Sequence, residues 1–278
     1  MKILIIGGAG FIGSHLCEAY SLNHDVTSID NYISGKKANH IDNVEYINLD
    51  AENIISMDRK FDIIFHFGEY SRVEQSLAKI DFVLNNNISP ILNVLQFAKK
   101  SCAKLIYAGS STKFSDNGKN KLKSPYSFSK WQNSELVKFY CELNRIPYAI
   151  TYFYNVYGGR ENFEGEFATV VAKFLYRKKQ NKKLQVTKPG TQTRNFTHID
   201  DTIRALLLIA DKGYGDEYGI ANPKSYTIKE VAEMISDQIE YISENVANRM
   251  SSELVTKKVF ELGWKPNTDL TDYIKNQL

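Results

Sequence analysis

Short apolar runs alternate with longer segments of helical periodicity through the first half of the chain. The run at residues 3–6 is apolar at every position, which is typical of a strand that is buried on both faces of a parallel sheet. Later segments place apolar residues three and four positions apart, which indicates amphipathic helices. Strands are predicted at residues 2–6, 25–29, 44–48, 61–66, 104–108 and 148–153, and helices near residues 11–22, 81–100 and 125–143. The alternation predicts an α/β fold with a parallel sheet and right-handed crossovers.

The pattern changes after about Gly158, where the predicted elements become shorter and less regular. They are a helix near residues 167–176, strands near 184–187 and 195–198, and helices near 200–211 and 228–239. We therefore expect two units. Residues 1–163 would form the sheet domain and residues 164–278 a smaller C-terminal substrate-binding lobe, with segment 195–212 packing back onto the first unit.

The composition is that of an ordinary globular protein, with 43% apolar and 24% charged residues among 278. The formal net charge of +3 is too small to favour a nucleic acid or a membrane surface as a partner. The sequence contains no run of about 18 apolar residues, so it predicts no membrane span. The scattered cysteines, Cys17, Cys102 and Cys141, argue against a disulfide framework and a zinc site. We expect a cytoplasmic enzyme without a metal and without a nucleic-acid or membrane partner.

The first predicted strand ends in a glycine-rich turn at residues 7–13 that leads directly into a helix. Read from Gly8, the turn has the pattern G-x-G-x-x-G. Glycine is needed there for a tight turn, for close approach of the backbone to a pyrophosphate and for packing of the helix on the strand. The helix N-terminus adds free N–H groups and the positive end of the helix dipole. The segment therefore predicts dinucleotide binding by a Rossmann-type, doubly wound parallel sheet.

Asp30, at the end of the second predicted strand, indicates which dinucleotide is bound. A carboxylate there accepts hydrogen bonds from the ribose hydroxyls and repels a 2′-phosphate, which favours NAD over NADP. Asp50, at the end of the third strand, could face the adenine in a similar way or simply cap the strand end. NAD is the predicted cofactor.

A second informative segment runs from Ser124 to Lys130. Ser124 is a suitable N-cap and Pro125 suits the first turn of a helix, so Tyr126 and Lys130 would fall one turn apart on one face. An ammonium near the phenol favours the phenolate, which could take a hydroxyl proton while hydride leaves the same carbon for NAD. The preceding strand leads into Ser110, whose hydroxyl could orient the substrate.

In this order the motifs resemble the extended short-chain dehydrogenase/reductase family, in particular its nucleotide-sugar epimerases, such as the UDP-glucose 4-epimerases, and its 4,6-dehydratases. The resemblance covers essentially the whole chain. The matching positions are residues 7–13, 30–31, 50, 66–68, 87, 110, 126, 130, 154–158, 194–201 and 262–264. The resemblance implies NAD as the cofactor and a nucleotide-diphosphate sugar as the substrate.

Carried over residue by residue, the resemblance assigns roles to further positions. Tyr126 would be the base, Lys130 its cationic partner and a ribose ligand, and Ser110 the hydroxyl partner. The expected cofactor contacts are Gly7, Gly10, Phe11, Ile12, Gly13, Asp30, Asn31, Ser34, Gly35, Asp50, Ala51, Phe67, Gly68, Asn87, Tyr126, Lys130 and Tyr154. The expected substrate contacts are Ser71, Arg72, Ser111, Asn155, Arg194 and Arg249. Asn155, Arg194 and Arg249 would bind the nucleotide diphosphate, since guanidinium groups suit phosphate oxygens.

The residues after Ser110 bear on the reaction that follows oxidation at C4. Family dehydratases usually place Asp-Glu immediately after the catalytic Ser or Thr, as the acid and base that remove water. Ser111 and Thr112 stand there instead, and neither is a useful acid or base near neutral pH. We therefore predict a 4-epimerase that acts through a transient 4-keto sugar. The alternatives are a 4,6-dehydratase, a 4-dehydrogenase or reductase that releases the keto sugar, and a non-catalytic dinucleotide-binding regulatory protein.

Two further expectations stay open at this point. The segment after the fourth strand departs from the usual epimerase pattern, and either Glu69 or Arg72 is expected to contact the substrate or else to have a surface or helix-capping role. The resemblance also implies a homodimer formed through two helices of the sheet domain. Leu136, Val137 and Tyr140 fit such an interface and fit core packing equally well.

Overall fold

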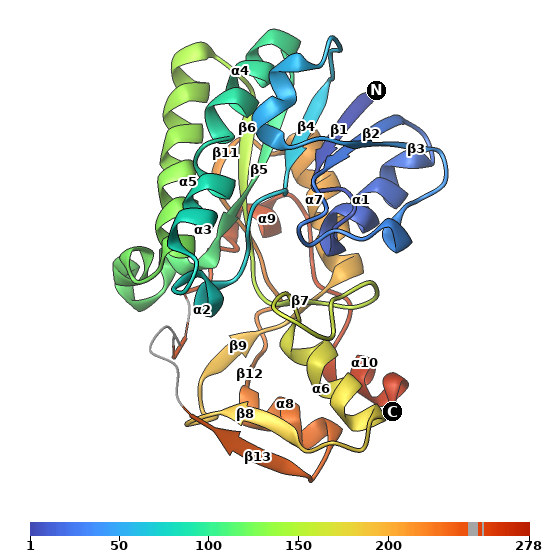
Figure 1. Ribbon diagram of the computed structural model, residues 1–278, viewed down its shortest axis with the longest axis vertical. Coiled ribbons are helices and arrows are strands. Elements are labelled where there is room, and N and C mark those ends of the chain that lie inside the picture. The colour runs from blue at the N-terminus through green and yellow to red at the C-terminus, as the bar shows by residue number, and fades with distance from the viewer. Residues whose placement is uncertain (244–249, 252) are drawn as a thin grey trace.

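The computed structural model describes residues 1–243, 250–251 and 253–278, and at its centre lies a seven-stranded sheet (Figure 1). The strand order is β11-β6-β5-β4-β1-β2-β3, and all neighbours in this sheet are parallel. The strands are β1 (Lys2–Ile6), β2 (Asp25–Asp30), β3 (Val44–Asn48), β4 (Ile63–His66), β5 (Lys104–Ser110), β6 (Tyr148–Phe153) and β11 (Gly215–Ile220). The predicted α/β fold with a Rossmann-type parallel sheet is confirmed.

The order of the strands reverses between β1 and β4. The chain builds the sheet outward from β1 to β3, and then returns past β1 to add β4, β5 and β6 on the other side. In parallel sheets of this kind, ligands bind at the carboxyl ends of the strands where the order reverses. The glycine turn after β1 and the segment after β4 both lie at this point.

Three strands differ from their predicted bounds. β2 extends by one residue, to Asp30, and β5 extends to Ser110 because its pairing with β6 continues as far as Phe153. β4 begins at Ile63, while Phe61, which was expected in the strand, packs in the hydrophobic core ahead of it.

Helices cover both faces of the sheet (Figure 1). On one face, α1 (Phe11–Ser21) and α7 (Ile199–Lys212) pack against each other and enclose the core that contains Ile3 and Ile5. On the other face, α4 (Ile91–Ser101) and α5 (Pro125–Asn144) enclose the core that contains Leu4 and Ile6. Successive residues of β1 thus alternate between two apolar layers, which explains why this strand has an unbroken apolar run.

The single helix predicted over residues 81–100 is wrong. The chain forms α3 (Ile80–Asn87) and then α4, which begins directly after Pro90. Proline lacks an N–H donor and disfavours the helical conformation of the residue before it, so the helix is interrupted there.

Among the residues that the structure describes, none of the helices has the length and apolar character that a membrane span requires.

A smaller lobe lies at the carboxyl edge of the sheet, in the lower half of Figure 1. Its strands form two pairs, β8 (Leu184–Thr187) with β13 (Ile239–Ile242) and β9 (Thr193–Asn195) with β12 (Ser225–Thr227). Its helices are α6 (Val170–Lys179), α8 (Ile228–Ile235) and α10 (Leu270–Gln277). Buried side chains from these elements form a separate apolar core that includes Phe174, Phe196, Val231 and Ile274.

The C-terminal half of the chain does not stay in this lobe. α7 packs against α1, β6 and β11 of the sheet domain. β11 adds an edge strand beside β6, and α9 (Lys257–Glu261) packs against β11. Residues 215–220 therefore belong to the sheet rather than to a continuous lobe over residues 164–278.

Candidate active site

The glycine turn lies at the carboxyl end of β1, where the backbone bends into α1. Gly7 has a φ of +89°, and a Cβ there would lie 2.8 Å from the Cα of Gly68. A Cβ on Gly13 would lie 2.1 Å from the carbonyl oxygen of Gly7, so α1 could not pack on the turn. An added Cβ on Gly10, the N-cap of α1, would meet only that same oxygen, at 3.2 Å. The outer surface of the turn is therefore open to a ligand.

The carboxylate of Asp30 holds this turn from the end of β2. It accepts hydrogen bonds from the N–H groups of Ala9 (2.9 Å) and Tyr32 (2.8 Å). Burial raises the pKa of Asp30, and these two hydrogen bonds oppose the rise. A Cβ on Gly35 would lie 2.8 Å from both carboxylate oxygens, so the loop after β2 also packs closely on Asp30.

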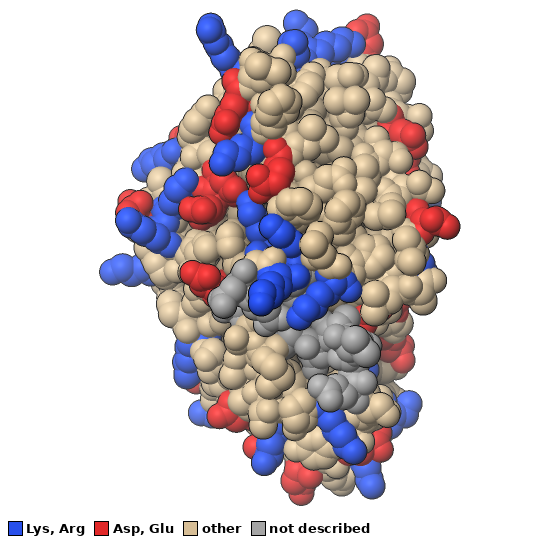
Figure 2. Space-filling view, turned by 90° about the vertical axis from the view of Figure 1, so that its left-hand side faces the viewer, with Lys and Arg blue, Asp and Glu red and all other residues tan. Residues whose placement is uncertain are grey.

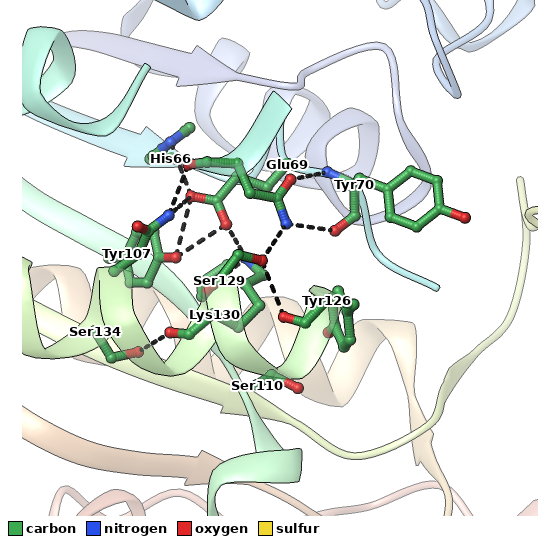
Figure 3. Close-up of polar contacts among 12 residues, drawn as sticks. His66, Glu69, Tyr70, Tyr107, Ser110, Tyr126, Ser129, Lys130 and Ser134 are labelled. Atoms are coloured by element: carbon green, nitrogen blue, oxygen red, sulfur yellow. Dashed lines mark hydrogen bonds and ion pairs between the residues drawn. The ribbon is translucent and has the colours of Figure 1, made fainter. Parts of the chain in front are cut away.

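α5 begins where the sequence predicts. Ser124 is its N-cap and accepts a hydrogen bond from the N–H of Ser127 (3.1 Å), and Pro125 occupies the first turn. Tyr126 and Lys130 follow one turn apart, and both line the cavity described below. Figure 3 shows this helix next to the end of β5.

The ammonium group of Lys130 is directed into a polar cluster behind the cavity (Figure 3). Its Nζ donates to the carbonyl oxygen of Ala108 (2.5 Å) and lies 2.8 Å from Oε2 of Glu69. The side chain of Glu69 has no exposed surface, because it is enclosed by α5, β4 and β5. The expected surface role of Glu69 is therefore wrong, and its contact with a substrate stays a prediction.

The end of β5 presents three hydroxyl groups. Ser110 Oγ lies 2.9 Å from Oγ1 of Thr112 and also accepts a hydrogen bond from the N–H of Thr112 (3.3 Å). Ser110, Ser111 and Thr112 are all nearly buried and all line the cavity. Ser111 and Thr112, at the two positions after Ser110, thus present hydroxyls to the cavity that Tyr126 also lines.

These groups share one cavity of about 470 Å³. Its wall combines the carboxyl ends of the central strands with residues of the smaller lobe. The cavity therefore extends from the glycine turn to the boundary between the sheet domain and the smaller lobe. The residues predicted from the sequence that line it are Gly7, Gly10, Phe11, Ile12, Gly13, Asp30, Asn31, Ser34, Phe67, Gly68, Ser71, Arg72, Ser110, Ser111, Tyr126, Lys130, Asn155 and Arg194.

Two predicted cofactor residues are turned into the protein instead. The side-chain oxygen of Asn87 accepts from the N–H of Tyr70 (2.8 Å), and its amide donates to Ser129 Oγ (2.9 Å). Tyr154 is buried and donates from its hydroxyl to the carbonyl oxygen of Glu253 (2.8 Å). Neither side chain reaches the cavity, because each is used to join neighbouring segments of the fold.

The other predicted residues outside the cavity wall have capping or packing roles in the fold, or lie beyond the described ranges. Asp50 accepts from the amide of Asn31 (3.0 Å) and caps the 3-10 turn that follows, which matches its alternative role as a cap. Ala51 packs in the core, and Gly35 packs on Asp30. Arg249 lies outside the described residues.

One side of the cavity was not predicted from the sequence. It is formed by residues 161–162 and 167–171, which lead from β7 (Val156–Tyr157) into the start of α6. No motif marks this segment, and it reaches the site because the chain crosses there from the sheet domain to the lobe. The guanidinium of Arg72 donates to the carbonyl oxygens of Ser71 (3.0 Å) and Phe167. Arg72 thus ties the new segment to the loop after β4.

Glu161 is a nearly buried carboxyl group in this segment. It accepts hydrogen bonds from the N–H of Gly158 (2.8 Å) and from the hydroxyl of Thr169. Burial outweighs these bonds and raises the pKa of Glu161 to about 7. Because the folded chain holds this proton more tightly than the unfolded chain, Glu161 is expected to lower the free energy of unfolding as the pH rises from roughly 4.3 through about 7.

Replacing Glu161 by Gln should remove this pH dependence. Between pH 5 and pH 8, the wild-type free energy of unfolding should fall by roughly 2–3 kcal/mol relative to that of the variant. Urea unfolding of both proteins across this range measures the difference. Parallel pH profiles would contradict the prediction.

The glycine end of the cavity fits a bound NAD. The turn leaves no room for side chains on Gly7 and Gly13 but is open above Gly10, as close approach of a pyrophosphate requires. The first N–H groups of a helix have no partner inside that helix, so the start of α1 can donate to phosphate oxygens. Asp30, at the end of β2, lines the same wall.

Comparison with known proteins gives one consistent family. The sequence model of the NAD dependent epimerase/dehydratase family matches residues 3–222. A UDP-N-acetyl-alpha-D-glucosaminuronate decarboxylase of Bacillus cytotoxicus is 31% identical over 255 residues, which cover 84% of this chain and 79% of the relative.

Two solved structures resemble the whole chain. A UDP-N-acetylglucosamine 4-epimerase of Methanobrevibacter ruminantium, in complex with UDP-N-acetylmuramic acid, is 26% identical with a TM-score of 0.90, covering 99% of this chain and 95% of that one. A UDP-glucose 4-epimerase of Thermotoga maritima with UDP-glucose is also 26% identical with a TM-score of 0.90, covering 99% of this chain and 96% of that one.

Proposed function

Because this chain belongs to the NAD-dependent epimerase/dehydratase family and is an NAD-dependent nucleotide-sugar enzyme, we propose that it is a 4-epimerase. The observation that carries the proposal is that Tyr126, Lys130 and Ser110 line the same cavity as the glycine turn. The whole-chain similarity to two 4-epimerases supports it.

In the proposed reaction, Tyr126 Oη takes the proton of the sugar 4-hydroxyl and later returns a proton to the same oxygen. Ser110 donates a hydrogen bond to that oxygen and so orients the sugar. The ammonium of Lys130 favours the phenolate form of Tyr126 by its charge. Bound NAD supplies the acceptor and then the donor of the hydride on C4. Asn155 and Arg194, on the lobe side of the cavity, would bind the diphosphate.

The end of β5 favours epimerisation over elimination of water. Elimination across C5 and C6 needs an acid and a base next to the catalytic hydroxyl. Ser111 and Thr112 occupy the two positions after Ser110 and offer only hydroxyls. A 4-keto sugar formed beside Tyr126 would therefore be reduced again rather than dehydrated.

A second candidate is a decarboxylase that acts on a sugar with a carboxylate group. The guanidinium of Arg72 lines the cavity, its Nε is buried without a hydrogen-bond partner, and it forms no ion pair within the described part of the chain. Such a cation could bind a sugar carboxylate. One relative of this chain carries the name of a UDP-N-acetyl-alpha-D-glucosaminuronate decarboxylase.

We also propose a homodimer that forms through the side of the molecule that carries α4 and α5. Leu92, Phe139 and Leu143 on these helices are exposed by 45%, 65% and 70%. Figure 2 faces the side of α5, and charged side chains are sparse on the upper right of this view. Of the residues expected at the interface, Val137 is fully buried and supports the fold, while Leu136 and Tyr140 pack against the core but are only partly buried.

A screen of nucleotide-sugars tests the proposed activity. The purified protein would be incubated with NAD and, in turn, with UDP-, GDP-, dTDP- and CDP-sugars, and the products analysed by mass spectrometry and NMR. A 4-epimerase gives a product of unchanged mass with inverted configuration at C4. A product lighter by one water or by one carbon dioxide would contradict the proposal and identify a dehydratase or a decarboxylase.

A further inference from the structure

Glu69 places a buried carboxylate directly behind the candidate catalytic pair. The residue lies in the loop after β4, and part of it lines the cavity, but its side chain points away from the cavity toward α5 and β5 (Figure 3). It therefore acts on the site only through the groups that it contacts.

Four side chains surround the carboxylate of Glu69. The ammonium of Lys130 lies 2.8 Å from Oε2, and the hydroxyl of Tyr107 lies within 2.9–3.0 Å of both oxygens. The amide of Asn133 donates to Oε1 (3.1 Å), and Nε2 of His66 lies 3.3 Å from the same oxygen. Both oxygens of the buried group are thus provided with donors.

The surroundings hold Glu69 in its charged form. Burial by itself disfavours the carboxylate, but Lys130 and His66 outweigh burial and lower the pKa of Glu69 to about 2. Burial and the neighbouring carboxylate raise the pKa of Tyr107 well above its usual range, so Tyr107 remains a donor. Lys130 and Glu69 therefore form a buried ion pair, and each would be an uncompensated charge without the other.

We propose that Glu69 is the positioning residue of Lys130. It fixes the ammonium against the carbonyl oxygen of Ala108 and offsets part of its positive charge at Tyr126. The inference rests on the proposed function in one respect only, the assignment of Tyr126 as the base. The ion pair itself is independent of that assignment.

The charge balance around Tyr126 sets the expected effect on the pH dependence of the reaction. Lys130 on α5 faces Glu69 from the loop after β4 and Tyr107 from β5, and His66 on β4 lies against Glu69. Arg72 adds a second cation, which interacts electrostatically with Tyr126. The carboxylates of Glu161 and Glu166 oppose Arg72, and the carboxylate of Glu69 opposes Lys130. Without Glu69, the charge of Lys130 is no longer offset, and the acid limb of the reaction should move to lower pH.

Glu69→Gln is therefore expected to move the acid limb of the kcat/KM profile to lower pH by roughly one unit. The maximal kcat should fall as well, because Lys130 is held less firmly. Glu135→Gln is the matched control, since Glu135 forms an ion pair with Lys113 (3.0 Å) on the exposed side of the same helix. The control should leave the acid limb in place. An acid limb that also stays in place in Glu69→Gln would overturn the effect on Tyr126.

A thermal double-mutant cycle tests the pair without any turnover. Glu69→Gln should lower Tm by roughly 6–10 °C, because it leaves the ammonium buried and unpaired. Adding Lys130→Met removes that ammonium, and the double variant should recover at least half of the loss. The double variant also provides a folded protein if Glu69→Gln alone does not fold.

The two measurements separate this inference from the proposed function. Additive Tm shifts in the cycle would overturn the pairing of Glu69 with Lys130, whether or not the enzyme turns over a sugar. A wild-type protein that changes no nucleotide-sugar would refute the proposed activity, while the cycle would still decide the role of Glu69.

Discussion

Tyr126→Phe is expected to lower kcat by about 10²–10⁴-fold, the range that general acid–base catalysis contributes. The variant loses only the phenolic oxygen, while the ring and its place at the start of α5 are kept. NAD binding and Tm should therefore stay close to the wild-type values. Steady-state rates with the sugar identified in the screen, together with NAD titration of both proteins, measure the effect.

A matched control comes from the same helix. Tyr140 lies on α5 and packs partly against the core. Tyr140→Phe removes the same atom at a position away from the cavity and should change kcat by less than a factor of two. If Tyr126→Phe kept more than a tenth of the wild-type kcat, the assignment of Tyr126 as the base would be wrong.

Gly7→Ala is expected to abolish tight NAD binding and to lower the free energy of unfolding by about 2–5 kcal/mol. Two costs add at this position. The φ of +89° is unfavourable for a residue with a side chain, and the new Cβ would lie 2.8 Å from backbone atoms of Gly68. Both costs act on the turn that would hold the pyrophosphate. Urea unfolding and NAD titration measure the two effects separately.

Gly215→Ala separates backbone strain from the close contact. Gly215 has a φ of +87°, and no atom lies within 4 Å of an added Cβ. This variant should lose only about 1–2 kcal/mol of stability and should bind NAD like the wild type. If Gly7→Ala and Gly215→Ala lowered the free energy of unfolding equally, the close contact between the glycine turn and Gly68 would contribute nothing to stability.

The strands and the glycine turn could be predicted because their signals are local. β1 is buried on both faces and has an unbroken apolar run, and the turn after it must contain glycine to form at all. β11 lacks such a signal. Its sequence, GDEYGI, has buried residues only in its second half, and its place at the edge of the sheet depends on its pairing with β6. A pairing between distant segments cannot be read from six residues.

In the candidate site, too, features with a local sequence signal could be predicted and features that depend on distant segments could not. Tyr126, Lys130 and Ser110 follow from the start of α5 and the end of β5, where local sequence determines the geometry. Asn87 and Tyr154 lie at positions that match the family, yet their side chains join parts of the fold instead of lining the cavity.

The surroundings of Glu69 and Glu161 could not be predicted for a related reason. Glu69 is enclosed by groups from β4, β5 and α5, and Glu161 reaches the cavity on the crossing to the lobe. Partners so distant in sequence come together only when the tertiary structure forms.

Transfer of hydrogen at C4 provides the most direct test of the central claim that Tyr126 acts as the base for reversible oxidation at that carbon. A nucleotide-sugar substrate identified in the screen would be prepared with deuterium on C4 and incubated with the wild-type protein and with Tyr126→Phe. The expected product of the wild type is the C4 epimer with its deuterium still on C4, and the variant should form it about 10²–10⁴-fold more slowly. An epimer that carries hydrogen from water at C4, or equal rates for the two proteins, would contradict the claim.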